Sequence, residues 1–349
     1  MSDTAEIQSA KAAAVHRIAV LDSFRALAIV PVLLFHYTMR WVPPQGPLAQ
    51  TQFLPLDGPF SLGWLGVEFF FMISGFVIFM TLHTCGSLRE FAARRFVRLY
   101  PTLAVAALIT LLLTPVIGMR MAPIGARDLG GSLILAPTLV HGLWVDQAYW
   151  SLQIEAIFYA WIGLLFFAAR ERFVTTWLLL LAGSTLVSLA IPTSHLLLLV
   201  ASPYLPFFSF GMAAYMRFSE GRISRRTGLL LAASAASYLI LWYARDPGVH
   251  IGIALMVLLF EGFLRGWLKW LAAPALVYLG QISYPLYLLH DVLGQSILSR
   301  LYAAGALSQP LAITSAALLM TAMAAGVHQW VEAPVQKRAR SIVRRLAPA

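Results

Sequence analysis

Apolar runs of about twenty residues repeat along the chain, and short polar stretches separate them. The runs lie near 20–40, 61–82, 101–118, 149–169, 173–191, 196–216, 227–244, 250–265, 275–298 and 311–331. A twenty-residue helix is about 30 Å long, which matches the hydrocarbon core of a bilayer. The pattern therefore predicts an all-α fold, a polytopic bundle of about ten transmembrane helices.

Composition supports a membrane protein rather than two soluble domains. Apolar residues make up 60% of the 349 residues, charged residues make up 11%, and the mean hydropathy is +0.77. A soluble chain could not cover so much apolar surface. The segment 119–148 is apolar but interrupted by Gly and Pro, so we expect it to be re-entrant or to lie on the membrane surface.

The net charge of +10 is unevenly distributed over the loops between these runs. An even number of spans places both termini on one side, and 19 of the 25 Lys and Arg residues fall on that side. These are Lys11, Arg17, Arg89, Arg94, Arg95, Arg98, Arg170, Arg172, Arg217, Arg222, Arg225, Arg226, Arg265, Lys269, Lys337, Arg338, Arg340, Arg344 and Arg345. Because cytoplasmic loops are enriched in basic residues, we expect both termini to be cytoplasmic. The excess charge then requires no nucleic-acid partner.

The chain shows no internal repeat and no linker, so one domain is expected. We divide it into an N-terminal cytoplasmic tail (1–17), a transmembrane domain (18–335) and a basic C-terminal tail (336–349). The N-terminus lacks the layout of a cleaved secretory signal, so the first span is expected to be an uncleaved anchor. The single cysteine, Cys85, excludes an intramolecular disulfide.

The first span carries two costly polar residues, Arg25 and His36. Eleven residues correspond to about three helical turns, so both side chains share a face about 16 Å apart. A guanidinium group suits phosphate, and a histidine can act as a general base near neutral pH. Coenzyme A, with its phosphates and long thin arm, has the shape to bridge them. In simpler readings, Arg25 pairs with Asp22 and His36 is a packing residue.

Other ionisable residues fall at two depths of the predicted bundle. His36, Glu68, Glu155, His290 and Asp291 are predicted to share the outer depth. Arg25 shares the inner side with "RRFVRLYP" (94–101), which also reads as an ordinary basic stretch before a span. The agreement in depth favours a functional cluster.

Six stretches resemble, in order, the motifs of the acyltransferase type 3 family, and the resemblance covers residues 18–335. They are "LDSFRALAIVPVLLFH" (21–36), "GWLGVEFFFMISGFVI" (63–78), "RRFVRLYP" (94–101), "YWSLQIEAIFY" (149–159), "LGQISYPLYLLH" (279–290) and "VEAP" (331–334). Glu68 stands where the family more often has aspartate, so it receives no catalytic role.

The resemblance implies an integral membrane enzyme, in the inner membrane of a bacterium, that moves an acyl group from acyl-CoA to a sugar. The donor is expected to be acetyl-CoA, with no metal, and the acceptor a hydroxyl of a glycan or lipid-linked sugar. His36 would be the general base or a transient acyl carrier, assisted by Glu155. Arg25, Arg95 and Arg98 would hold the donor phosphates. Supporting or acceptor-binding candidates are Trp150, Ser151, Tyr284 and His290.

Two alternatives stay open at this stage. One is a proton-coupled transporter, although the sequence shows no repeated halves of the kind that carriers have. The other is acylation of a small molecule such as a macrolide. The sequence also leaves open whether the bilayer-embedded chain forms a homo-oligomer.

Overall fold

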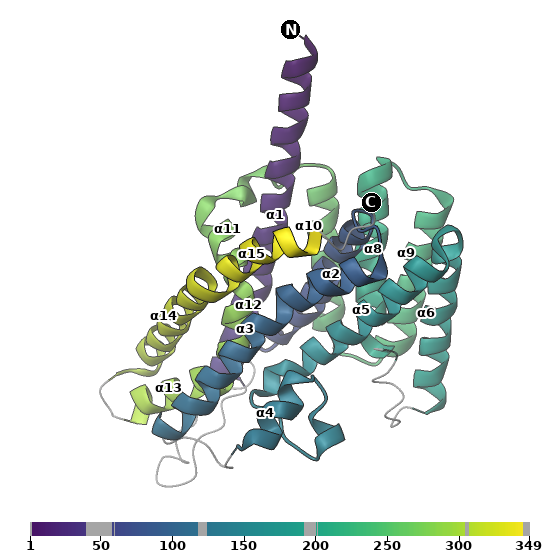
Figure 1. Ribbon diagram of the computed structural model, residues 1–349. Coiled ribbons are helices and arrows are strands. Elements are labelled where there is room, and N and C mark those ends of the chain that lie inside the picture. Colours follow the sequence, from purple (N-terminus) through teal and green to yellow (C-terminus); the bar gives the residue numbers. More distant parts are fainter. Residues whose placement is uncertain are drawn as a thin grey trace.

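The structure is a computed structural model of the chain, and it describes residues 2–39, 58, 60–117, 124–191, 200, 202–303 and 307–344. All regular elements within these residues are helical (Figure 1). The α-helices are α1 (Ser2–Thr38), α2 (Gly66–Leu82), α3 (Leu88–Ile117), α4 (Ala126–Leu133), α5 (Trp150–Ala168), α6 (Phe173–Ala190), α8 (Leu205–Glu220), α9 (Arg225–Trp242), α10 (Pro247–Leu264), α11 (Pro274–Gln281), α12 (Ser283–Leu289), α13 (Val292–Ala303), α14 (Gln309–Val327) and α15 (Ala333–Arg344).

Seven segments among the described residues are long and apolar enough to cross a bilayer. They are Ala19–Thr38, Gly63–Leu82, Leu88–Ile117, Gln147–Ala168, Arg170–Ala190, Pro247–Leu264 and Gln309–Ala339. The chain is thus a multi-pass membrane protein. Helices α8 and α9 and the pieces of the expected span 275–298 are not among the seven, and part of the expected span 196–216 lies outside the described residues.

Two expected spans differ from the structure. The span expected at 101–118 begins earlier, because α3 starts at Leu88 and continues through Pro101 at the cost of one backbone hydrogen bond. The basic motif 94–101 is therefore helical and does not form a loop. The span expected at 275–298 is divided into α11, α12 and α13, with breaks at Ile282 and at 290–291.

Close contacts between helices depend on glycine. A Cβ atom on Gly75 of α2 would lie 2.1 Å from the Phe208 carbonyl oxygen of α8, and one on Gly211 would lie 2.0 Å from the Met72 oxygen. Similarly, a Cβ on Gly280 of α11 would overlap the carbonyl group of Asp22 in α1. These pairs, α2 with α8 and α1 with α11, pack most extensively and form the centre of the bundle.

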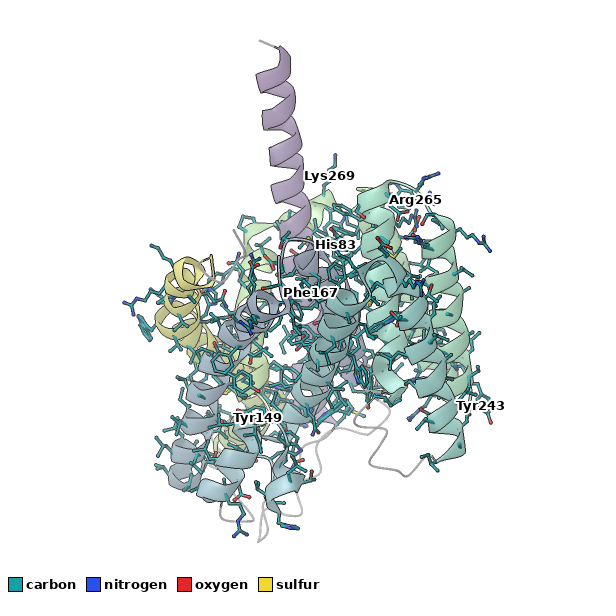
Figure 2. The ribbon with its side chains drawn as sticks, turned by 45° about the vertical axis from the view of Figure 1, so that its right-hand side comes forward. His83, Tyr149, Phe167, Tyr243, Arg265 and Lys269 are labelled. Atoms are coloured by element: carbon teal, nitrogen blue, oxygen red, sulfur yellow. The ribbon has the colours of Figure 1, made fainter. Side chains whose placement is uncertain are left out.

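The bundle has two distinguishable ends. His83, Arg265 and Lys269 lie at the end from which the N-terminal part of α1 projects, and we call this the basic end (Figure 2). Tyr149 and Tyr243 lie toward the opposite end. The short helix α4, within the segment 119–148, also lies toward the opposite end and packs on α3 (Figure 1). Because α4 has only eight residues, it is too short to span a bilayer.

Candidate active site

A narrow cavity lies among α1, α2, α3, α5 and α12, with a volume of about 100 Å³. Its polar lining comes from every one of these helices: Arg25, Ser74, Arg95, Arg98, Ser151, Glu155, Tyr159, Ser283, Tyr284 and Tyr287. Typical ligand pockets measure roughly 300–1,000 Å³. This cavity therefore has room for a thin extended group, and a bulky nucleotide would have to stay at its entrance.

Three arginines border the cavity, and their partners differ. Arg25 forms an ion pair with Asp22 one turn earlier on α1. Arg98 forms an ion pair with Glu332, whose side chain is only 1% exposed. Arg95 lies over the ring of Tyr159 at 5.8 Å, and its buried Nε has no hydrogen-bond partner in the part of the chain that the structure describes.

The positions of Arg95 and Arg98 follow from the helical structure of the motif. Residues three apart lie on one face of a helix, so both guanidinium groups point from α3 to the same cavity. Guanidinium donors that lack a carboxylate partner attract anions. Arg95 is the arginine best able to bind a phosphate group, because Arg98 is already paired with the buried carboxylate of Glu332.

The carboxylate of Glu155 lies in this cavity and is held by two hydroxyl groups. Ser74 of α2 donates to its Oε1 at 2.6 Å, and Tyr159, one turn further along α5, donates to the same oxygen at 2.5 Å. The structure corrects one member of the expected outer cluster, since Glu155 lines the cavity with the arginines and His36 does not. The error came from judging depth by sequence position along separate helices.

Three aromatic or hydroxyl side chains of the late motif and α5 also border the cavity. Tyr284 donates to the Leu99 carbonyl of α3 at 2.9 Å, and the Arg98 guanidinium lies 5.3 Å from its ring centre. Ser151 shares a 2.7 Å hydrogen bond with the hydroxyl of Tyr287, which also donates to the Ala148 carbonyl at 3.0 Å. The remaining candidate of this group, Trp150, packs against Tyr204 and is not part of the lining.

His36 and His290 form a buried pair, 6% and 0% exposed, with ring centres 4.8 Å apart. The Nδ1 of His36 lies 2.8 Å from the Val32 carbonyl, and the Nδ1 of His290 lies 2.7 Å from the Tyr287 carbonyl. Because carbonyls only accept, each Nδ1 carries a proton. The Nε2 of His290 then accepts, at 3.4 Å, from the Nδ1 of His36. This arrangement leaves the Nε2 of His36 unprotonated, and it forms no hydrogen bond with another described residue.

Tyr287 connects the cavity to the histidine pair. Its side chain lines the cavity, its ring lies 5.3 Å from the ring of His290, and its carbonyl fixes the His290 tautomer. Tyr287 is therefore the residue through which the cavity borders the histidine pair. Arg25 lies on α1 about 16 Å from His36, toward the basic end, so a group bound there would have to be long.

The other acidic residues of the expected outer cluster have local roles or no visible partner. Asp291 accepts a hydrogen bond from Gln295, one turn along α13. Glu68 is 2% exposed in the first turn of α2, and its Oε2 has no partner among the described residues. No group of three or more His, Cys, Asp or Glu side chains in the described ranges is arranged to hold a metal ion.

Sequence reasoning missed four residues of this site: Ser74, Tyr159, Ser283 and Tyr287. Each is an uncharged hydroxyl residue inside an apolar run, where it is not exceptional. Spacing was the available signal, since Glu155 and Tyr159 are one helical turn apart, as are Tyr287 and His290.

The fold and the cavity define a membrane-embedded protein whose helices surround a cavity bordered by three arginines and a glutamate. The sequence profile described as an acyltransferase domain matches residues 18–328, and the chain belongs to this family, acyltransferase type 3. A protein of Acidianus two-tailed virus, named "Putative acetyltransferase ORF330", is 24% identical over 256 residues, which cover 68% of this chain and 75% of the viral protein. No solved structure gives a significant match. The chain is thus a membrane acyltransferase, and the transporter alternative loses its support.

Proposed function

We propose that the protein transfers an acyl group, most simply acetyl, from acyl-CoA to a hydroxyl group of a glycan or lipid-linked sugar. The observation that carries this proposal is that the arginines and Tyr287 line one cavity, and that Tyr287 contacts the buried histidine pair. Phosphates would bind at the arginines, the thin arm would occupy the cavity, and the thioester would reach His36. We place the protein in the cytoplasmic membrane of a bacterium, with the donor entering from the basic end.

In this reaction the acceptor oxygen attacks the thioester carbonyl carbon, and the carbon–sulfur bond breaks. The Nε2 of His36 removes the hydroxyl proton and returns it to the departing thiolate, so that atoms and charges balance. Val32 and His290 hold the other ring nitrogen, which keeps the lone pair of Nε2 directed away from them. Glu155, held by Ser74 and Tyr159, adds a fixed negative charge to the cavity that Arg95 also lines.

A second route uses the same atom as a nucleophile. Nε2 would bond to the acyl carbon and expel the thiolate, and the acceptor hydroxyl would then displace the imidazole, its proton passing through the freed Nε2 to the thiolate. Rapid quenching in the absence of acceptor separates the routes, because only the second produces a peptide containing acetylated His36. The general-base route leaves this peptide unmodified.

The proposal is tested with purified protein in lipid nanodiscs. Acetyl-CoA and membrane glycolipid extract are supplied, and free coenzyme A thiol is measured together with transfer of labelled acetate. We expect thiol release that depends on acceptor and is lost in His36→Ala. Uptake of labelled acetate without thiol release, or no turnover of acetyl-CoA by a folded protein, would contradict the proposal.

A further inference from the structure

A second hollow lies outside the candidate active site, between α9 and α10. Its volume is about 560 Å³, within the range of ligand pockets. The lining comes from α2, α8, α9 and α10: Met72, Pro206, Phe207, Phe210, Leu231, Ser234, Ala235, Tyr238, His250, Ile253, Ala254, Val257 and Leu258. We call this hollow the lateral groove. It exists because α9 packs closely on α8 and α6, whereas α10 contacts α8 and the turn Gly63–Leu65 only sparingly.

The lateral groove opens toward hydrocarbon. Leu258 on its rim is 63% exposed, and its neighbours on the outer faces of the two helices, Leu239 and Leu255, are 57% and 56% exposed. In a multi-pass membrane protein such faces contact lipid. Apolar cavities of this kind do not hold water, so a hydrocarbon chain is the occupant that the lining suits.

One end of the groove is polar. The Tyr238 hydroxyl and the Nδ1 of His250 are hydrogen-bonded at 2.6 Å, near the end of α9 and the start of α10. Trp242 stacks beside Tyr238, and the Arg245 guanidinium lies 5.2 Å from the Trp242 ring centre. Tryptophan, tyrosine and arginine at a helix end are typical of the membrane interface. The groove is therefore shaped for an amphiphile, with its chain among the apolar residues and its anionic head near Arg245 and His250.

This polar end lies on the His36 side of the molecule. Tyr243, in the loop between α9 and α10, lies toward the same end as Tyr149, whose hydroxyl donates to the Leu288 carbonyl beside the histidine pair (Figure 2). Packing also connects the two sites. The turn Gly63–Leu65 lies between α10 and α1: a Cβ on Gly252 would meet Leu65, and a Cβ on Gly63 would meet Phe35, next to His36.

We propose that the lateral groove binds the hydrocarbon chain of a lipid-linked acceptor, with Tyr238, His250 and Arg245 contacting its phosphate or sugar head. This inference rests on the proposed acyl transfer and selects the lipid-linked acceptor over a free glycan. A chain gains little by moving from bilayer to groove, because both are apolar. The contacts with the head group and the fit of the chain in the groove must therefore select the acceptor over the surrounding lipids.

Binding is tested with a hexadecyl phosphate that carries a photoreactive diazirine in its chain, added to the protein in phosphatidylcholine nanodiscs. After irradiation, peptide mapping should place the label on α9 and α10. Ala235→Trp and Ala254→Trp fill the groove and should abolish this labelling. Ala236→Trp is the matched control, because Ala236 is exposed on the same helix but does not line the groove. It should leave the labelling unchanged, and label distributed evenly over all lipid-facing helices would overturn the proposal.

Function is tested with the same variants and the glycolipid extract. Ala235→Trp and Ala254→Trp should lower acyl transfer about tenfold or more, and Arg245→Ala should raise the acceptor KM about tenfold, the size of one charge-assisted hydrogen bond. Acetyl-CoA binding should not change in any of them. Normal transfer by a variant with a filled groove would overturn the acceptor assignment. Failure of the wild-type protein to transfer would instead defeat the proposed function, while the photolabelling would still report on the groove.

Discussion

At the scale of single residues, the reactivity of His36 depends on which of its ring nitrogens carries the proton. Two acceptors, the Val32 carbonyl and the Nε2 of His290, lie next to its Nδ1. Both favour the tautomer with a free Nε2 lone pair, which is the form that a general base or a nucleophile needs. His290 would thus act as a positioning residue, through His36, without touching the reacting atoms.

This arrangement predicts unequal effects of two histidine substitutions. His36→Ala should lower kcat by about 10²–10⁴-fold, whereas His290→Ala should lower it less, because the Val32 carbonyl still holds Nδ1. Donor affinity should remain close to wild type in both. His83→Ala is the control, since His83 lies at the basic end away from this pair. Steady-state kinetics and acetyl-CoA titration measure both quantities, and equal losses for the two variants would contradict a positioning role for His290.

The two arginines of the α3 motif should also differ. Arg95→Ala should weaken acetyl-CoA binding by about one to two decades with little change in stability, because it removes charge-assisted contacts of roughly 1.5–3 kcal/mol each. Arg98→Ala should destabilise the fold by about 1.5–3 kcal/mol, the size of a hydrogen bond to a charged group, because the buried Glu332 carboxylate then keeps only His328 and Gln336 as partners.

Thermal unfolding and donor titration separate the two effects. Glu332→Gln in combination with Arg98→Ala should restore part of the lost stability, since it removes the buried charge that Arg98 neutralised. A fully stable Arg98→Ala protein would show that the ion pair with Glu332 contributes nothing to the fold.

The sequence predicted the charged members of this site but missed the hydroxyl groups that hold them. An arginine or a glutamate inside an apolar run is costly and therefore conspicuous. A serine or tyrosine in the same place is common, so Ser74 and Tyr159 gained meaning only when folding brought them to Glu155. Distance between helices, which decides such contacts, is not encoded in any local pattern.

At the scale of helices, the contact between α2 and α8 positions the site. Gly75 allows the Phe208 carbonyl of α8 to approach α2 closely, and the preceding residue, Ser74, reaches Glu155 on α5. Any side chain at position 75 must push the helices apart and shift this serine. The stability of the bundle and the geometry of the cavity are therefore linked at one residue.

Gly75→Ala should destabilise the protein by about 1–3 kcal/mol, the usual cost of overpacking, and should lower acyl transfer at the same time. Gly183→Ala in α6 is the matched control, because nothing lies within 4 Å of its Cβ position. Replacing glycine in a helix with alanine stabilises it by roughly 0.5–1 kcal/mol where space is free. Thermal unfolding of both variants measures the difference, and similar effects at the two positions would show that the close approach is unimportant.

Apolar runs predicted that the helices exist better than they predicted the residues at which the helices begin and end. The early start of α3 and the division of the span expected at 275–298 were both missed. The second case has a physical basis in tertiary contacts. Asp146, from another segment, accepts a hydrogen bond from the Val292 backbone and so caps the start of α13, which no pattern within 275–298 could reveal.

At the scale of the whole molecule, the proposed reaction takes its donor and its acceptor from opposite sides of the membrane, and the two ends of the bundle differ. His83, Arg265 and Lys269 mark the basic end, and Tyr149 and Tyr243 mark the other (Figure 2). If the basic end is cytoplasmic, acyl-CoA enters beside the arginines, while the acceptor reaches His36 from the opposite leaflet.

Cysteine labelling in intact cells tests this orientation. Cys85 is 3% exposed, and burial raises the pKa of its thiol. It should therefore react slowly with maleimides near neutral pH, because the thiolate is the reactive form. Cys85→Ser removes any residual background. Thr84→Cys and Tyr243→Cys are then added singly, at exposed positions after α2 and after α9.

A membrane-impermeant maleimide should label Tyr243→Cys in intact cells, or in spheroplasts if an outer membrane blocks access, and should label Thr84→Cys only after permeabilisation. The reason is that we expect five helices between the two positions to cross the membrane: α3, α5, α6, and also α8 and α9, although these two are not among the seven long apolar segments. An odd number of crossings places the two positions on opposite sides. Labelling of both from the outside would mean that one of these helices does not cross the membrane. The donor and the acceptor could not then approach His36 from opposite faces, and the proposed path of acyl-CoA through the cavity would have to be abandoned.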